Sequence, residues 1–216
     1  MKQLLPSLFI LSILLSSCSS IYMPSVPNTP MLTTKGEIAA GAHMSLKGNF
    51  NFNSAYAVGN HVALMANGAY MQNEKTKKDV KNKAIEIGGG YFNTFGPDNN
   101  RILEIYAGIG SGKSDRIFRE FDKNDVLISS DNQKADYDKK FIQVNYSSKK
   151  RDNLRLFGVN FGLNYGTALR MSFINTNNFY RNGVLQANED NIFIEPVFFT
   201  RMILSEQVQL QYTSGS

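Results

Sequence analysis

The sequence predicts an all-β protein, folded as an antiparallel up-and-down β-barrel of eight to ten strands. Three observations predict this fold. From Lys35 onward, apolar residues recur at every second position, which is the period of a strand. One face of each segment is aromatic and aliphatic, whereas the other is mostly Gly, Ala, Asn and Gln. Short turns alternate with long polar connections along the chain.

Residues 1–17 are predicted to be a secretory signal of the lipoprotein type. Lys2 gives a short charged region, and the apolar run from Leu8 to Leu15 follows it. The segment Leu15-Ser16-Ser17-Cys18 matches the lipobox pattern of an aliphatic residue, two small residues and Cys. What the lipobox implies is cleavage before Cys18 and attachment of three acyl chains to it, which hold a protein firmly to a membrane. Ser19 resembles the default signal for sorting to the outer membrane.

Cys18 is also the only cysteine, so the mature chain has no internal disulfide and no thiol for catalysis. Residues 18–34 contain Pro24, Pro27 and Pro30, which exclude a long helix or a central strand. We therefore expect 18–34 to be an extended tether between the lipid and the domain. Residues 35–216 are long enough for one β-barrel domain.

The first four strands follow from alternation. The first sets Ile38 and Met44 against Glu37 and His43, and the second sets Phe and Tyr against Asn and Ala. The third alternates less cleanly, and the fourth sets Ile and Tyr against Glu and Gly. These four strands are expected over 37–46, 49–58, 62–71 and 85–91.

The remaining five strands follow the same rule. The seventh, 157–166, is the clearest, since aromatic and aliphatic residues alternate strictly with Gly and Asn. The ninth sets Val, Leu and Tyr against three Gln residues. The five are expected over 103–110, 141–146, 157–166, 192–203 and 207–212.

The connections differ in length on the two sides of the predicted barrel. Those on one side are short and turn-like: 59–61, 96–100, 147–153 and 204–206. Those on the other side are long and polar, apart from 47–48: 72–82, 113–138 and 175–191. This asymmetry is typical of outer-membrane barrels, with the long loops at the cell surface. A periplasmic N-terminus would send the first strand outward, in agreement with that orientation.

The two faces favour a membrane barrel over a soluble one. A soluble barrel fills its interior with bulky apolar side chains, whereas here small and amide residues suit a narrow lumen and bulky residues would meet lipid. Tyr56, Tyr91, Tyr165 and Tyr212 lie near strand ends, where an aromatic girdle is expected. No apolar helix long enough to span a bilayer follows the signal.

From Lys35 to its end the chain resembles the small outer-membrane β-barrel proteins of Gram-negative bacteria. The resemblance rests on the alternation and on segments such as Ala55-Tyr56-Ala57-Val58, Met65-Ala66-Asn67-Gly68 and Phe193-Ile194-Glu195-Pro196. It implies a fold and a location, and it implies no catalytic residues.

Nine strands are an odd number, whereas single-chain bacterial barrels usually have an even one. The sequence also ends at Tyr212-Thr213-Ser214-Gly215-Ser216, without the terminal aromatic residue that such barrels usually carry. We therefore expect a tenth strand to be missing, so that the chain is truncated at its C-terminus. The alternative is an eight-stranded barrel in which the third or the sixth segment is not a strand.

Charged residues on the polar strand faces are expected to point into the lumen, where buried charges must be paired. The predicted network consists of Glu37, Glu86, Glu104, Arg155, Arg170, Glu195 and Arg201. A structural network that fills a narrow barrel is the favoured interpretation. A selectivity or binding site in the lumen is the alternative.

Other chemistry is weakly indicated. Residues 107–114 satisfy a loose phosphate-loop spacing, but no parallel strand and helix surround them, so no nucleotide is expected. The net charge of +5 arises in short polar connections, so no nucleic-acid partner is expected either. His43 and His61, without a further cysteine, do not indicate a metal site or cofactor.

The sequence therefore predicts a lipid-anchored outer-membrane barrel with a structural or surface-interaction role and no catalysis. Its expected partners are membrane lipid and a surface ligand bound through 113–138 and 175–191. One alternative is a soluble, periplasm-facing, lipocalin-like barrel that binds a small apolar ligand. Another is a membrane-embedded enzyme that modifies lipid, for which His43 is the only candidate general base and no Ser-His-Asp arrangement is legible.

Overall fold

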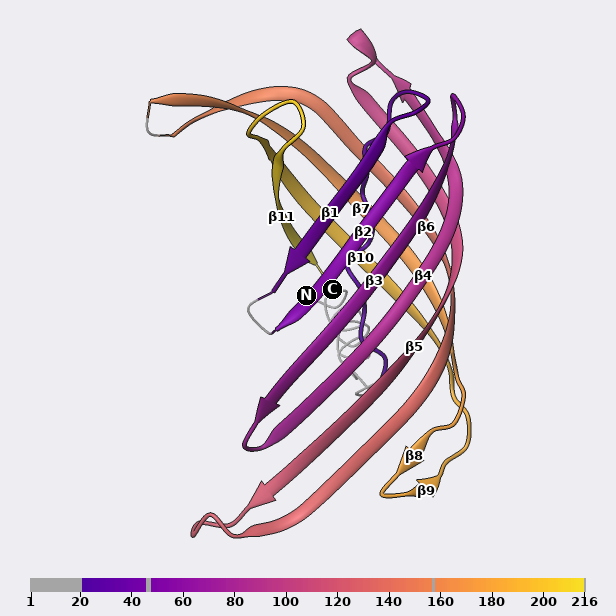
Figure 1. Cartoon of the computed structure of the whole chain (residues 1–216), viewed down its shortest axis with the longest axis vertical. Helices are drawn as coiled ribbons and strands as arrows, with labels where there is room; N and C mark the ends of the chain where they lie inside the picture. The colour runs from indigo at the N-terminus through magenta and orange to yellow at the C-terminus, as the bar shows by residue number, and fades with distance from the viewer. Residues whose placement is uncertain (1–20, 46–47, 157, 216) are drawn as a thin grey trace, which may run out of the picture.

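Nine long strands form one antiparallel up-and-down sheet in the computed structural model, which describes residues 21–45, 48–156 and 158–215 (Figure 1). Their bounds are β1 Ile38–Met44, β2 Asn49–Ala57, β3 Val62–Lys75, β4 Lys78–Phe95, β5 Arg101–Phe121, β6 Leu127–Leu156, β7 Val159–Thr176, β10 Asp190–Ile203 and β11 Gln209–Gly215. The hairpin of β8 (Tyr180–Arg181) and β9 (Val184–Leu185) pairs with β6, and the 3-10 helix η1 spans Pro97–Asn99. No helix among these described residues is long and apolar enough to cross a membrane.

The sheet curls through 263° and does not close. The prediction of a closed barrel is therefore wrong for this chain, although the antiparallel up-and-down topology is confirmed. Strands β1 and β11 each pair with one neighbour only. As the first and ninth of an up-and-down series they run in the same direction, so they could not pair with each other in an antiparallel ladder. We call the gap between β1 and β11 the seam.

All nine predicted strands exist, including the third and the sixth, which excludes the eight-stranded alternative. Several are much longer than predicted, because 72–82 and 113–138 are mostly strand rather than loop. We call these two ranges the charged extension. Opposite charges face one another across β5 and β6 there, as in Lys113–Asp136 at 3.3 Å and Asp115–Lys134 at 3.5 Å. Such cross-strand pairs hold polar segments in a sheet.

The turn predicted at 147–153 is also wrong, since β6 continues through these residues to Leu156. Its pairing with β5 ends at Ser148, and beyond that point β6 pairs with β7 alone. The chain reverses after Leu156, where Gly158 has a φ of 83°. Only Gly adopts such a left-handed backbone conformation without strain.

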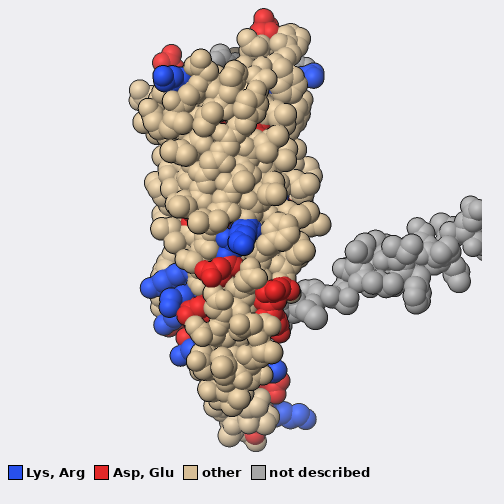
Figure 2. Space-filling model, turned by 90° about the vertical axis from the view of Figure 1, so that its right-hand side faces the viewer, with Lys and Arg blue, Asp and Glu red and all other residues tan. Residues whose placement is uncertain are grey.

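The predicted alternation places bulky apolar residues on the convex face. Ile109, Leu169 and Phe198 are 57%, 53% and 65% exposed, whereas Arg170 on the concave face is fully buried. We call the convex set the apolar belt: Phe50, Phe52, Leu64, Ile85, Ile87, Ile105, Ile109, Ile142, Val144, Leu169, Met171, Ile192, Ile194 and Phe198. Figure 2 shows a broad band almost without charged side chains, with most of the charges gathered toward one end.

Residues 21–34, which we call the strap, lie inside the curled sheet rather than outside it (Figure 1). They have no regular secondary structure, in agreement with the prolines, but Tyr22, Ser25 and Leu32 are buried. The sequence predicted a tether because it carries no signal of what lies around an extended segment. The strap starts toward the long connections and ends at the tight turns, where β1 begins. Strand β1 therefore begins on the side of the tight turns, as expected, but the chain reaches that side through the inside of the sheet.

Candidate functional site

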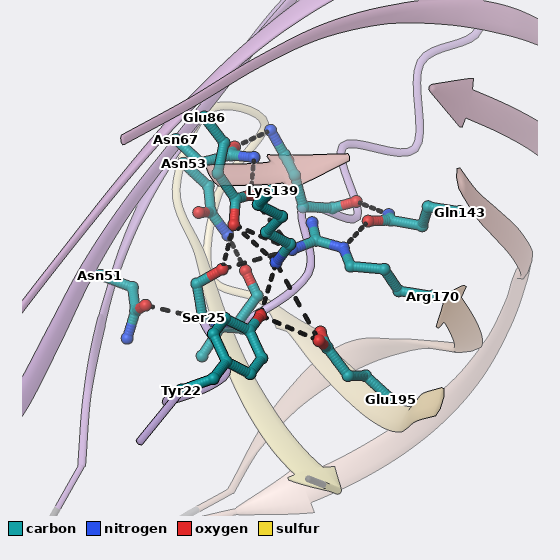
Figure 3. A network of polar contacts seen from close by, with 12 residues as sticks. Tyr22, Ser25, Asn51, Asn53, Asn67, Glu86, Lys139, Gln143, Arg170 and Glu195 are labelled. Atoms are coloured by element: carbon teal, nitrogen blue, oxygen red, sulfur yellow. Dashed lines mark hydrogen bonds and ion pairs between the residues drawn. The ribbon is translucent and has the colours of Figure 1, made fainter. Parts of the chain in front are cut away.

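Four charged side chains from four strands meet at the centre of the concave face (Figure 3). Lys139 Nζ on β6 lies 2.8 Å from Glu86 Oε1 on β4 and 4.0 Å from Glu195 Oε1 on β10. Arg170 Nη1 on β7 lies 3.1 Å from Glu86 Oε2. Two acidic and two basic groups thus balance one another, and each of the four is at most 3% exposed. Such deeply buried charges are tolerated only when they are paired and hydrogen-bonded.

The strap completes this network. The Tyr22 hydroxyl donates to Glu195 Oε1 at 2.9 Å and accepts from Lys139 Nζ at 2.7 Å. The Ser25 hydroxyl donates to Glu86 Oε1 at 2.6 Å. Each carboxylate therefore receives a hydroxyl hydrogen bond from the strap in addition to its basic partner, so strap and sheet form one polar core.

Amide side chains continue the network along the strap. Gln143 receives a hydrogen bond from Arg170 Nε at 2.8 Å and donates from Nε2 to the Asn28 carbonyl at 2.5 Å. Asn28 Nδ2 in turn donates to Asn67 Oδ1 at 2.9 Å. The Arg170 guanidinium also lies 4.6 Å from the centre of the Phe141 ring, which adds a cation–π contact.

Glu104 forms a second buried centre nearer the tight turns. Its carboxylate accepts hydrogen bonds at 3.1 Å from the Leu32 N–H, the Tyr106 hydroxyl and Asn145 Nδ2. The Leu32 bond again joins sheet and strap. Because these three groups are neutral donors, this carboxylate is satisfied by hydrogen bonds rather than by an ion pair.

The other predicted charges lie apart from this centre. Arg201 donates from Nη2 to the Thr29 carbonyl and to Gln211 Oε1, both at 2.6 Å, beside the seam. Glu37 accepts from the Thr33 N–H at 2.7 Å, in the turn that leads into β1. Arg155 is exposed, in the part of β6 beyond its pairing with β5. Its predicted place in the lumen is therefore wrong, because the sheet no longer curls around that part of the strand.

Sequence reasoning missed Lys139 and the contribution of the strap. Lys139 shares the phase of Phe141 and Gln143, so the alternation could have placed it inside if the strand had been extended by two residues. Nothing in the sequence pointed to Tyr22 and Ser25, because an irregular segment has no periodicity that reveals its buried side.

The remaining candidates hold no site among the described residues. No group of three or more His, Cys, Asp or Glu side chains there could bind a metal ion. The phosphate-loop-like residues Ala107–Ser114 lie within β5, paired with β4 and β6. His43 is on β1 next to the seam, and Cys18 lies outside the described residues.

Comparisons with known proteins add no relative. No protein-family model matches the chain, and no match is found among curated proteins or among solved structures.

Proposed function

We propose that the chain is a lipid-anchored outer-membrane β-barrel protein with a structural or surface-interaction role, and that its own strap fills its lumen. The apolar belt is the observation that carries this proposal. Ile109 and Leu169 are more than half exposed on the convex face, while Glu86 and Arg170 are buried on the concave one. In water this arrangement would be inverted, whereas in a bilayer it satisfies both faces.

The soluble, lipocalin-like alternative is disfavoured by the same residues. A barrel that binds a small apolar ligand needs an apolar interior with room for that ligand. Here the concave face holds a neutralised charge network, and strap residues such as Tyr22 occupy the space. An open pore is disfavoured for the same reason. In the part of the chain that the structure describes, no arrangement of a nucleophile and a base favours the lipid-modifying enzyme.

The strap also bears on the orientation of the anchor. Its first residues lie toward the long connections, since Tyr22 packs against Tyr137 and Ile174 near those ends of β6 and β7. Cys18 is three residues before Ile21, which allows a reach of at most about 10 Å. In this proposal the acyl chains enter the bilayer on the same side as the charged extension. With that extension at the cell surface, the lipid would occupy the outer leaflet, and the extension would present the ligand-binding surface.

Matched lysine substitutions on β5 test membrane insertion in a Cys18→Ala background, in which the lipid cannot hold the protein. Ile105 lies in the apolar belt, and Ile117 lies on the same face within the charged extension. Ile105→Lys should destabilise the membrane-inserted state by about 2–4 kcal/mol, and Ile117→Lys by no more than about 1 kcal/mol.

The measurement is resistance of membranes to urea and carbonate extraction, together with faster migration of unheated protein on a gel. Retention of the Cys18→Ala protein, and its loss specifically with Ile105→Lys, would support insertion. Release of the Cys18→Ala protein as a soluble species, or equal effects of the two lysines, would overturn it.

A further inference from the structure

The edge of β1 at the seam carries unpaired backbone groups. The Ser45 N–H donates to the Asn49 carbonyl, and the Ala57 N–H donates to the Glu37 carbonyl. At both ends of the β1–β2 ladder, therefore, the odd-numbered residues on the β1 side hydrogen-bond to β2. In a regular antiparallel ladder the intervening residues point their N–H and C=O groups the other way. The backbone N–H and C=O groups of the even-numbered residues within Ile38–Met44 thus point into the seam, and no described backbone group bonds to them there.

The edge of β11 is open in the same way. The Leu204 N–H donates to the Val208 carbonyl, and the register continues unbroken from this pair along β10 and β11. The backbone N–H and C=O groups of the even-numbered residues of β11 therefore point toward β10. The odd-numbered residues Gln209, Gln211 and Thr213 present their backbone groups to the seam, where no described backbone group pairs with them.

The geometry of the gap suits one more strand. Because β1 and β11 run in the same direction, a single strand running the opposite way makes antiparallel ladders with both. The curl of 263° leaves 97° of a full turn open, that is, 360° minus 263°. A ten-stranded barrel spaces its strands about 36° apart, so one added strand with its two intervals needs about 72°. A second added strand would again leave parallel neighbours.

The strap cannot be this strand, although it lies beside the seam and runs in the required direction. Pro24, Pro27 and Pro30 lack the N–H groups that a strand between two neighbours must donate. Asn28 and Thr29 instead line a groove of about 480 Å³ between the seam edges. The other described residues that line this groove belong to strands of the sheet or to the turns next to them, so none of them supplies a further strand.

The side chains along the seam define the chemistry of the missing strand. On the convex side Ile38, Met44 and Tyr212 are 73%, 85% and 72% exposed, so apolar neighbours would cover them. On the concave side the groove is lined by polar groups, among them Arg201 and Gln211. An occupant therefore needs apolar residues at alternate positions and small or amide residues between them, as the existing strands have within the apolar belt.

We propose that the seam binds one extended strand from outside residues 1–216, antiparallel to both β1 and β11. The inference deepens the proposed function and rests on it, because backbone groups left open in a bilayer have no water to satisfy them. Strand addition at an open edge is a common mode of peptide recognition. Here two edges bind the same strand, which distinguishes the seam from an ordinary sheet edge.

The test uses the whole chain folded in detergent micelles and a fluorescent nine-residue peptide that alternates Val with Thr and Gln. Hydrogen exchange should show simultaneous protection of the even-numbered amides of β1 and the odd-numbered amides of β11. Ala42→Pro removes one N–H at the seam without touching the ladder to β2, and should weaken peptide binding about tenfold. Ala42→Ser keeps that N–H and should bind like the parent protein. Both variants must retain the migration of folded, unheated protein.

Absence of protection, or protection of one edge only, would overturn the proposal. Protection of both edges without peptide, together with a concentration-dependent dimer, would show that a second copy fills the seam instead and would equally overturn it. Membrane insertion is measured without the peptide, so the two proposals fail separately. A protein that binds the peptide at both edges in micelles but is extracted from membranes would refute insertion alone.

Discussion

Removal of the Arg170 guanidinium should leave a net negative charge in the core of this protein. In the folded chain Glu86 and Glu195 face Lys139 and Arg170, so two negative groups balance two positive ones. Arg170→Met preserves much of the side-chain volume but leaves two carboxylates with one basic partner. Breaking one half of a buried pair costs about 3–5 kcal/mol, because the remaining charge stays buried. We expect a loss of stability of that size.

A second substitution tests the reasoning. Glu86→Gln alone leaves two basic groups with one carboxylate and should also cost several kcal/mol. The double variant Arg170→Met/Glu86→Gln leaves Lys139 opposite Glu195, so neutrality is restored. It should be destabilised by less than the sum of the single effects, with a coupling of about 1–3 kcal/mol. Arg155→Met is the matched control, since Arg155 is exposed and its removal should change stability by no more than about 0.5 kcal/mol.

The assay is urea unfolding of the protein folded in detergent micelles, followed by far-ultraviolet circular dichroism and by tyrosine fluorescence, since the chain has no Trp. Equal, small effects of Arg170→Met and Arg155→Met would refute the view that the central charges depend on one another. Strict additivity of the Arg170 and Glu86 substitutions would refute it as well.

Two further predictions concern the packing of the sheet and the charged extension. A Cβ atom added to Gly108 would lie 2.5 Å from Phe141 Cζ and 2.4 Å from a backbone oxygen, whereas one added to Gly68 would meet nothing within 4 Å. Gly108→Ala should therefore lower the free energy of unfolding by about 1–3 kcal/mol in the same urea assay, and Gly68→Ala should leave it almost unchanged. In the part of β6 beyond the apolar belt, the hydrogen bond from Arg181 lowers the pKa of Asp131. Because that pKa is depressed, the Asp131–Arg181 pair stabilises the hairpin above the usual Asp pKa, and this stabilisation is lost as pH falls through the lowered value. Proteolysis of the β8–β9 hairpin should therefore accelerate in acid. Asp131→Asn should abolish this pH dependence.

The sequence revealed which residues of most strands face out and where three of the tight turns lie, because both depend on local patterns. Strict alternation put Ile105 and Glu104 on opposite faces, and the structure has them so. The length of the strands was less visible. In 113–138 the alternation is between polar residues, and the pairing that makes it a strand lies in the complementary charges of two segments, such as Lys113 and Asp136. A single-segment pattern does not show such pairs.

Only part of the candidate site could be predicted, because a local pattern shows the face on which a residue lies and little of what surrounds it. Glu86, Glu104, Arg170 and Glu195 could be assigned to the concave face by their phase, and all four are buried there. Arg155 has the phase of an inward residue but lies where the sheet no longer surrounds it. The phase of the alternation shows on which face of a strand a residue lies, but it does not show whether the rest of the protein buries that residue. The hydrogen bonds that Tyr22 and Ser25 make are long-range contacts across more than 60 positions, which only the assembled fold defines.

The open seam bears on how the strap comes to lie inside the sheet. Without the strap, Glu195 would lose the Tyr22 hydroxyl and keep only the Lys139 contact at 4.0 Å, so the sheet and the strap must be stable together. In the proposed lipoprotein, three acyl chains precede the strap by a few residues, and they are far too bulky to thread through a lumen lined by Arg170 and Phe141. An open sheet avoids this threading, because it can curl around the strap from the side while the lipid stays in the membrane. A strand that later filled the seam would then enclose the strap within the barrel.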